Sequence, residues 1–153
     1  MKKLLCLLIL MMLMLISVSA FAEKDVSCSF CSLRCPDSFS VVSEDQLTLS
    51  GDFSLVIRVQ NLGQDISAEQ FFASCNDAFI AGEQGALTGA EFTVSRLSEI
   101  GRYTFVENSF TYNGIRYTQF LLPVGSNVFI FTTDASSGSS TLQSILKSFV
   151  PAN

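Results

Sequence analysis

Four cysteines have the clearest potential for chemistry in this sequence. Cys28, Cys31 and Cys35 follow the pattern C-x2-C-x3-C-P, and Cys75 lies further along the chain. The pattern matches the end of a ferredoxin cluster-binding run, but Asp25 stands where that run has its first cysteine. A C-x-x-C pair also lowers the pKa of a thiol in thioredoxin-like enzymes, where it opens a helix after a strand. Neither context is present here, so we expect no metal and no cofactor.

A structural disulfide is the interpretation that we favour, with Cys28, Cys31, Cys35 and Cys75 as candidates. The chain begins like an exported protein, and thiols oxidise outside the cytoplasm. Four cysteines allow three pairings, and the sequence does not choose among them. We expect one disulfide within the leader, residues 23–37, with Cys75 either a buried thiol or pinning the leader to the first helix. The alternative is a thiol-disulfide redox protein that uses Cys28 and Cys31.

Asn108 and Gln119 form a second candidate site, because the predicted register places them opposite each other between apolar layers. Their amides could satisfy one another, or they could form the floor of a small ligand site. The chain contains no histidine. This excludes Ser-His and Cys-His nucleophiles, imidazole bases and histidine-containing zinc sites. We therefore expect no catalytic residues and a protein that is not an enzyme.

A three-stranded meander over residues 100–133 would position this pair. Asn113-Gly114 between two β-rich runs is typical of a type I′ turn, because both residues tolerate a positive φ. The apolar run Val128–Phe131 indicates cover on both faces of the sheet. Besides Asn108 with Gln119, the predicted pairs are Tyr112–Ile115, Phe110–Tyr117, Val106–Leu121, Thr111–Arg116, Ser109–Thr118, Glu107–Phe120 and Phe105–Leu122.

Two helices and further strands complete the expected elements. The first helix begins after Ser67, with Gln70 as capping-box partner, and ends at Gly82. Residues 82–89 are expected to be a flexible connection. The last helix begins after the cap Ser140 and ends before Pro151. Strands are expected at 39–42, 47–49, 53–59 and 91–97, with none in the leader.

The first 22 residues are typical of a secretory signal peptide. Lys2 and Lys3 precede an apolar run of about 15 residues, and the small-x-small site Ala20-Phe21-Ala22 follows. We expect cleavage after Ala22, a leader at 23–37 and one domain at 38–153. The product would be secreted or periplasmic and would have no membrane span.

The expected mature chain is acidic. Without Lys2 and Lys3 it has seven basic residues against fourteen acidic ones, a net charge of −7. Nucleic acid and anionic lipid surfaces would be repelled. The expected partner is a protein or a cell-envelope component, with positive charge favoured.

The order of these elements resembles the PsbP-like superfamily, which includes the DcrB-type envelope proteins. Short matching segments cover roughly residues 39–150, and they are Ser67-Ala68-Glu69, Ile100-Gly101-Arg102, the Asn113-Gly114 hairpin, the strand 125–133 and the closing segment 145–149. The resemblance implies an α+β fold, a three-layer α/β/α sandwich with a central antiparallel sheet. It also implies non-catalytic binding or assembly-accessory work, but it specifies no partner.

Overall fold

The computed structural model describes residues 22–43 and 46–152. The predicted signal peptide, apart from Ala22, lies outside the described residues. The strands are β1 (Glu23–Ser27), β2 (Cys31–Pro36), β3 (Ser40–Ser43), β4 (Leu47–Ser50), β5 (Ser54–Asn61), β6 (Glu91–Ile100), β7 (Tyr103–Tyr112), β8 (Ile115–Val124), β9 (Asn127–Thr133) and β10 (Val150–Pro151). The helices are α2 (Ala68–Ser74), α3 (Asn76–Ala86) and α4 (Ser140–Ser148). No helix within the described residues is long and apolar enough to cross a membrane.

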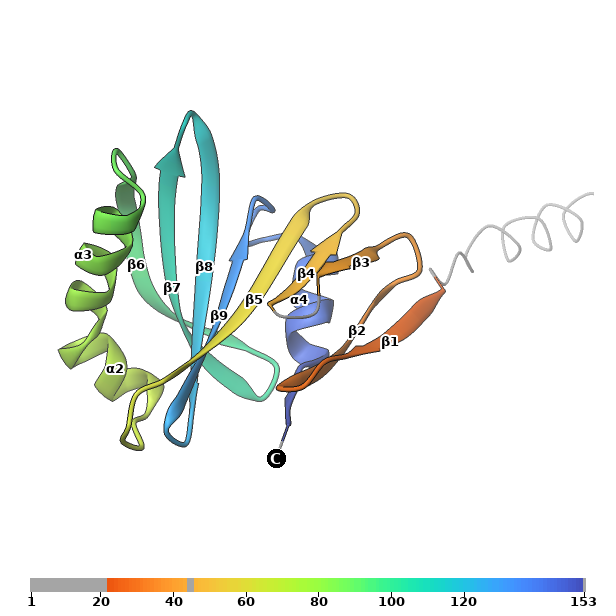
Figure 1. Ribbon diagram of the computed structural model, residues 1–153, viewed down its shortest axis with the longest axis horizontal. Coiled ribbons are helices and arrows are strands. Elements are labelled where there is room, and N and C mark those ends of the chain that lie inside the picture. Colours follow the sequence, from red (N-terminus) through yellow and green to blue (C-terminus); the bar gives the residue numbers. More distant parts are fainter. Residues whose placement is uncertain (1–21, 44–45, 153) are drawn as a thin grey trace, which may run out of the picture.

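A seven-stranded antiparallel sheet in the order β3-β4-β5-β9-β8-β7-β6 forms the centre of the molecule (Figure 1). Its β7–β8 hairpin confirms the predicted register in every pair from Tyr112–Ile115 to Val106–Leu121. Asn113 and Gly114 have φ values of 51° and 76°, as a type I′ turn requires. The register places Asn108 and Gln119 opposite each other, as predicted.

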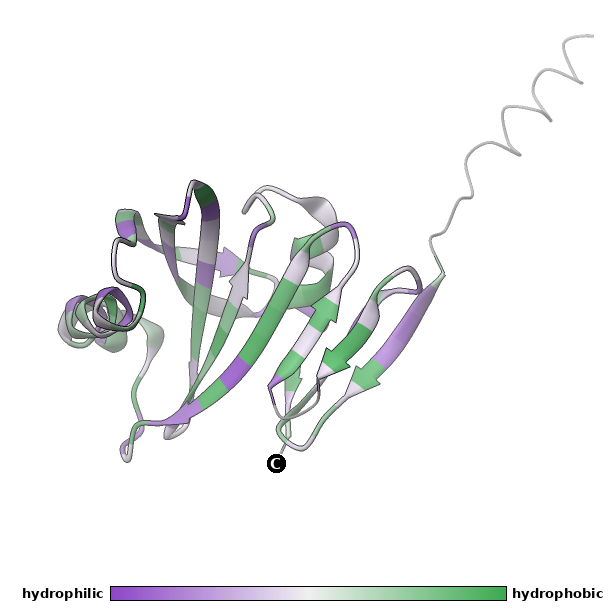
Figure 2. Cartoon of the chain, turned by 45° about the horizontal axis from the view of Figure 1, so that its top comes forward, coloured by the Kyte–Doolittle hydropathy of each residue, from purple (hydrophilic) through white to green (hydrophobic). Residues whose placement is uncertain are grey.

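One face of this sheet carries the larger hydrophobic core, which includes Phe105, Phe120 and Phe131. Helix α4 covers it together with a second, three-stranded sheet in the order β1-β2-β10. Phe149 at the end of α4 lies with its ring centroid 4.9 Å from that of Phe131. Figure 2 shows the outer strand β1 as largely hydrophilic. The core therefore lies between the two sheets and α4.

The prediction of no strands in residues 23–37 is wrong. Cys31, Leu33 and Cys35 are buried at alternate positions of β2. Buried thiols act as small apolar side chains, so these cysteines supply the period-two pattern of a half-buried strand. The strand is missed when the cysteines are counted only as reactive groups and not as apolar side chains.

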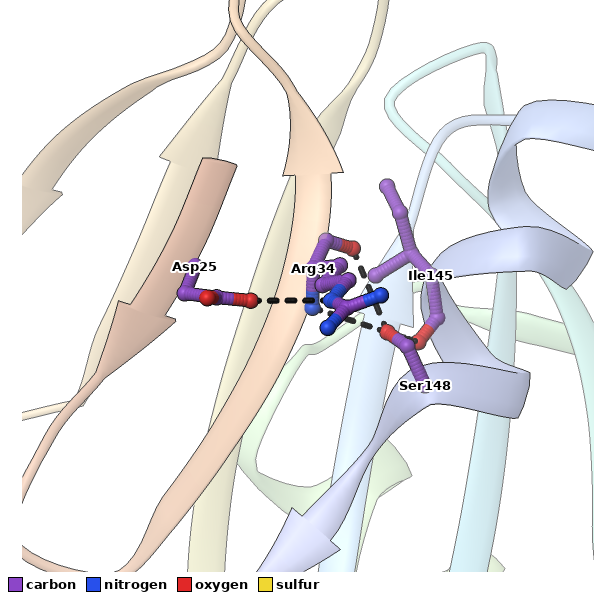
Figure 3. Close-up of polar contacts among 4 residues, drawn as sticks. All are labelled: Asp25, Arg34, Ile145 and Ser148. Atoms are coloured by element: carbon purple, nitrogen blue, oxygen red, sulfur yellow. Dashed lines mark hydrogen bonds and ion pairs between the residues drawn. The ribbon is translucent and has the colours of Figure 1, made fainter. Parts of the chain in front are cut away.

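Ser148 joins α4 to β2 beyond the point where β10 stops pairing (Figure 3). The Arg34 backbone N–H donates to Ser148 Oγ at 2.8 Å, and Ser148 Oγ lies 3.2 Å from the Arg34 carbonyl oxygen. The Arg34 side chain donates to Asp25 Oδ1 at 2.9 Å across the small sheet. One hydroxyl thus continues the hydrogen-bonding ladder that β10 begins.

The opposite face carries a smaller core around Phe71, Val106 and Ile130, with α2 and α3 over it. The capping box of Ser67 and Gln70 is confirmed. The first helix, however, breaks at Cys75 and α3 continues to Ala86, so the predicted end at Gly82 is wrong. A β-carbon added at Gly82 would meet no atom within 4 Å, and an exposed helix tolerates such a glycine at a modest cost. Residues 82–86 are therefore helical, not a flexible connection.

The mixed class and the antiparallel sheet are confirmed. The predicted three-layer α/β/α sandwich is not confirmed, because the larger core is covered by a helix and a small sheet together and not by a layer of helices. The last helix is capped by Ser139, whose Oγ accepts from the Leu142 N–H, one residue before the predicted cap Ser140.

Candidate functional site

A buried polar cluster joins the start of α3 to the sheet. Asn108 and Asn76 face each other as two amides, with Asn108 Nδ2 donating to Asn76 Oδ1 at 2.8 Å and Asn76 Nδ2 to Asn108 Oδ1 at 3.2 Å. Ser95 Oγ donates to Asn108 Oδ1 at 2.7 Å. These contacts occupy Asn108 with protein partners. Its amide therefore holds α3 in place and leaves little for a ligand.

The Gln119 side chain also forms a hydrogen bond to α3, and not to Asn108. Its Nε2 donates to Glu83 Oε2 at 2.8 Å and lies 3.3 Å from Thr132 Oγ1. Glu83 also pairs with Arg58. The Gln119 amide cannot adopt the flipped orientation, because its oxygen would then face the Glu83 carboxylate. The two amides of the predicted site, Asn108 and Gln119, thus form hydrogen bonds to different residues.

The Gln119 carbonyl oxygen, Oε1, is left without a donor. It is the one buried side-chain nitrogen or oxygen within the described residues that has no hydrogen-bond partner. Gln119 is 1% exposed and lines a pocket of about 240 Å³ between the end of α3 and the sheet. Other lining residues are Val56, Arg58, Glu83, Leu87 and Phe110. An unpaired buried acceptor is costly, so a donor from a ligand or water would be stabilising here.

Sequence reasoning missed the α3 residues of this cluster, Asn76 and Glu83. A signal for Asn76 was present, because it lies four residues after Phe72 and three before Phe79, on the apolar stripe. A polar residue at such a position indicates a buried partner. Glu83 gave no comparable signal, since it follows the glycine that was expected to end the helix.

The cysteines lie in two separate places. Cys28 and Cys31 are close, with their Sγ atoms 3.4 Å apart, and Cys35 is buried further along β2. Cys75 packs against the smaller core on the other side of the sheet. It therefore cannot pin the leader to the first helix, and all four described cysteines are thiols in this structure.

Burial disfavours the thiolate at two of these positions. It raises the pKa of Cys31, with a smaller contribution from the contact with Cys28, and it raises the pKa of Cys35. No group of three or more potential metal ligands of the His, Cys, Asp or Glu type occurs among the residues that the structure describes. Cys31 and Cys35 thus lack the low-pKa environment of reactive thiols.

Strand β6 is a long edge of the large sheet. Nine of its ten residues pair with β7, with a bulge between Phe92 and Val94, and no strand in the described part of the chain pairs with its other side. Arg96 on β6 makes a two-pronged contact with the buried Glu107 of β7, at 3.1 Å from Nε and 2.9 Å from Nη2. Leu97 beside it is 39% exposed. The edge is therefore held in a fixed register and open to solvent.

No family model and no curated protein matches the sequence. Solved structures do match. The solution structure of cyanobacterial PsbP (CyanoP) from Synechocystis sp. PCC 6803 is similar with a TM-score of 0.58 at 10% identity, over 89% of this chain and 96% of that chain. This chain has the PsbP-like fold. The predicted resemblance is thereby confirmed at the level of the fold.

Two further solved structures match this chain over most of its length. A protein from Bacteroides thetaiotaomicron has a TM-score of 0.51 at 11% identity, over 86% of this chain and 48% of that chain. The chain thus spans about half the length of that protein. LpqN, involved in cell envelope biogenesis of Mycobacterium tuberculosis, has a TM-score of 0.41 at 14% identity, over 86% and 91% of the two chains.

Proposed function

We propose that this chain is an exported, non-enzymatic accessory domain, which binds an extended segment of a cell-envelope protein along the β6 edge. The observation that carries the proposal is the open, ten-residue edge of β6. The signal-like residues 1–22 support export, and the lack of histidine supports a non-catalytic role. Other PsbP-like folds supply an analogy of fold only.

An edge strand offers unpaired backbone groups to a peptide that adds a further strand. The Arg96–Glu107 contact fixes the register of β6 before a partner arrives, which lowers the entropic cost of binding. Leu97 lies opposite Val106, a residue of the smaller core, and gives the edge an exposed apolar contact. The negative charge of the chain favours a basic segment as partner.

The test compares two lysine substitutions of exposed apolar residues. Leu97→Lys places a charge on the β6 edge, whereas Ile115→Lys, at a residue 49% exposed beside the hairpin turn, is the control. A photoreactive amino acid at Glu99 reports the partner by cross-linking in exporting cells. We expect Leu97→Lys to reduce cross-linking about tenfold, which corresponds to about 1.4 kcal/mol. Ile115→Lys should leave cross-linking unchanged.

Equal cross-linking in both variants, with circular dichroism showing both folded, would contradict the proposed binding edge. A second photoreactive residue in the loop 62–66, between β5 and α2, serves as a comparison. Cross-linking from this loop alone, and not from position 99, would contradict the binding edge as well. Each result would leave the exported, accessory role to be tested at another surface.

A small-ligand carrier is the second candidate, favoured by Gln119, which lines this pocket and whose buried Oε1 has no hydrogen-bond partner. Apolar walls and a neutral ion pair at Arg58 and Glu83 suit an uncharged compound with an N–H or O–H donor. Small primary amides and alcohols are the probes. A ligand should raise the Tm of the parent protein and not that of Gln119→Leu. No rise with any probe, or an equal rise in the variant, would contradict this site.

A thiol-disulfide redox activity receives no support. Cys31 is 2% exposed, and burial raises its pKa. Cys31 therefore does not suit the attacking role, and Cys28 lies in the turn between β1 and β2 and not at the helix start that activates the thiol of a thioredoxin-like motif.

A further inference from the structure

We propose that Cys28 and Cys31 form a disulfide in the exported protein, while Cys35 and Cys75 remain thiols. The disulfide is a staple across the β1–β2 turn and not a catalytic centre. The observation that supports this bond most directly is the distance of 3.4 Å between the two sulfur atoms. Formation of the bond requires only a small movement of the side chains.

The backbone of the turn suits this bond. Ser27 and Ser32 are the last pair of the β1–β2 ladder, and the Cys28 N–H then donates to the Cys31 carbonyl at 2.9 Å. Cys28 and Cys31 therefore face each other across a two-residue turn. Facing residues of such a hydrogen-bonded pair have Cα atoms about 5.5 Å apart. That separation is within the range of native disulfides.

The other pairings are excluded by position. Cys35 lies four residues beyond Cys31 on the same strand, which is about 13 Å at the rise of an extended chain. It faces Lys24 of β1, not a cysteine. Cys75 lies on the far face of the seven-stranded sheet. Among the four described cysteines, the structure thus leaves one pair.

The chemistry is a thiol-disulfide exchange with a disulfide oxidant such as glutathione disulfide. The partly exposed Cys28 sulfur loses its proton, attacks the oxidant and releases one thiol. The Cys31 sulfur then loses its proton and attacks Cys28 Sγ, releasing the second thiol. Two protein thiols are oxidised to one disulfide, and the oxidant is reduced to two thiols. Because Cys31 is buried, it suits the second step and not the first.

The disulfide would stabilise the pairing of residues 150–152 with β2 and with the β1–β2 turn. Val150 pairs with Ser32 and Pro151 with Cys31. The Ala152 N–H donates to the Phe30 carbonyl at 2.9 Å, inside the stapled turn. Fixing the turn therefore fixes the backbone groups to which β10 binds. The small sheet over the larger core becomes more stable as a unit.

The sequence permits a direct test by peptide mapping. The protein is equilibrated in native buffer with excess glutathione disulfide, alkylated in denaturant and digested with trypsin. Cleavage after Lys24 and Arg34 yields one peptide with both Cys28 and Cys31, while Cys35 and Cys75 fall in two others. We expect the 25–34 peptide to carry no alkyl group and to be two hydrogen atoms lighter than its reduced form. Cys35 and Cys75 should be alkylated.

An alkylated 25–34 peptide, or one cross-linked to Cys35 or Cys75, would overturn the proposal. A second measurement tests the staple itself. The Tm should be about 5 °C higher in the oxidised protein than in the reduced protein. Cys28→Ser should abolish this difference, whereas the control Cys75→Ser should keep it. Equal Tm values in the two redox states of the parent, or a difference that survives in Cys28→Ser, would show that no such staple exists.

Discussion

Cys31 and Cys35 turn their sulfur atoms into the larger core, where a thiolate would lack water, and the charge of Lys24 opposes this effect only in part at Cys35. Burial is the main cause that raises the pKa of each above its ordinary value of 9.0. The unfolded chain releases these protons near pH 9, but the folded chain keeps them. Stability from the buried thiols is thus complete below pH 9 and is lost as the pH rises above it.

We therefore predict that the free energy of unfolding of the reduced protein falls between pH 8 and pH 10.5. Each thiol that stays protonated contributes a slope of up to about 1.4 kcal/mol per pH unit above pH 9. Urea unfolding at several pH values measures the slope. Cys35→Ala should make this slope shallower by the contribution of one thiol. The difference between the two proteins separates the thiol effect from that of other groups that titrate at alkaline pH. An unchanged slope in Cys35→Ala would contradict the prediction.

At the scale of elements, local signals predicted local structure well. The Asn113-Gly114 turn fixed the β7–β8 register, and Ser67 with Gln70 marked the start of α2. The failures involve tertiary contacts. Strand β2 depends on α4 and β10, which lie at the other end of the chain, and α3 passes Gly82 because polar contacts such as Glu83–Gln119 hold it to the sheet. The place of Asn76 on the apolar stripe indicates a buried partner, but the identity of that partner, Asn108, depends on a tertiary contact between α3 and the sheet.

Two glycines provide a matched test of these local rules. Gly114 has a φ of +76° in the hairpin turn, whereas Gly82 lies in α3, and an added β-carbon would meet nothing within 4 Å at either position. Gly114→Ala should destabilise the protein by about 1 kcal/mol, because alanine resists a positive φ. Gly82→Ala should stabilise it by about 0.5–1 kcal/mol. Urea unfolding measures the change in the free energy of unfolding of each variant. Changes of the same sign would contradict the assigned turn or helix.

At the scale of the whole molecule, the larger core is closed by residues from the 23–37 segment. Val26, Cys31, Leu33 and Cys35 all contribute buried side chains to it. Their removal would expose the side of α4 that contacts β2. The sequence-based boundary at residue 38 would thus divide a packed unit.

We predict that a chain beginning at Ser38 does not fold stably. Burial of one large apolar side chain contributes about 1.5–3 kcal/mol, so the loss of four core residues approaches the 5–15 kcal/mol stability of a typical domain. Thermal unfolding followed by circular dichroism compares this chain with one that begins at Glu23. A cooperative transition at the same Tm in both would show that the segment is only an appendage.

The contacts of Arg34 with Ser148 and of Ser32 with Val150 also have a consequence for biosynthesis. They join the first described strands to the last, so the larger core cannot close on the ribosome before residues up to about 151 have been made. Contacts so distant in sequence form slowly, because the intervening chain must first be ordered. For the export proposed above, such late closure would keep the nascent chain open enough to be threaded through a translocation channel, and the fold would be completed after translocation.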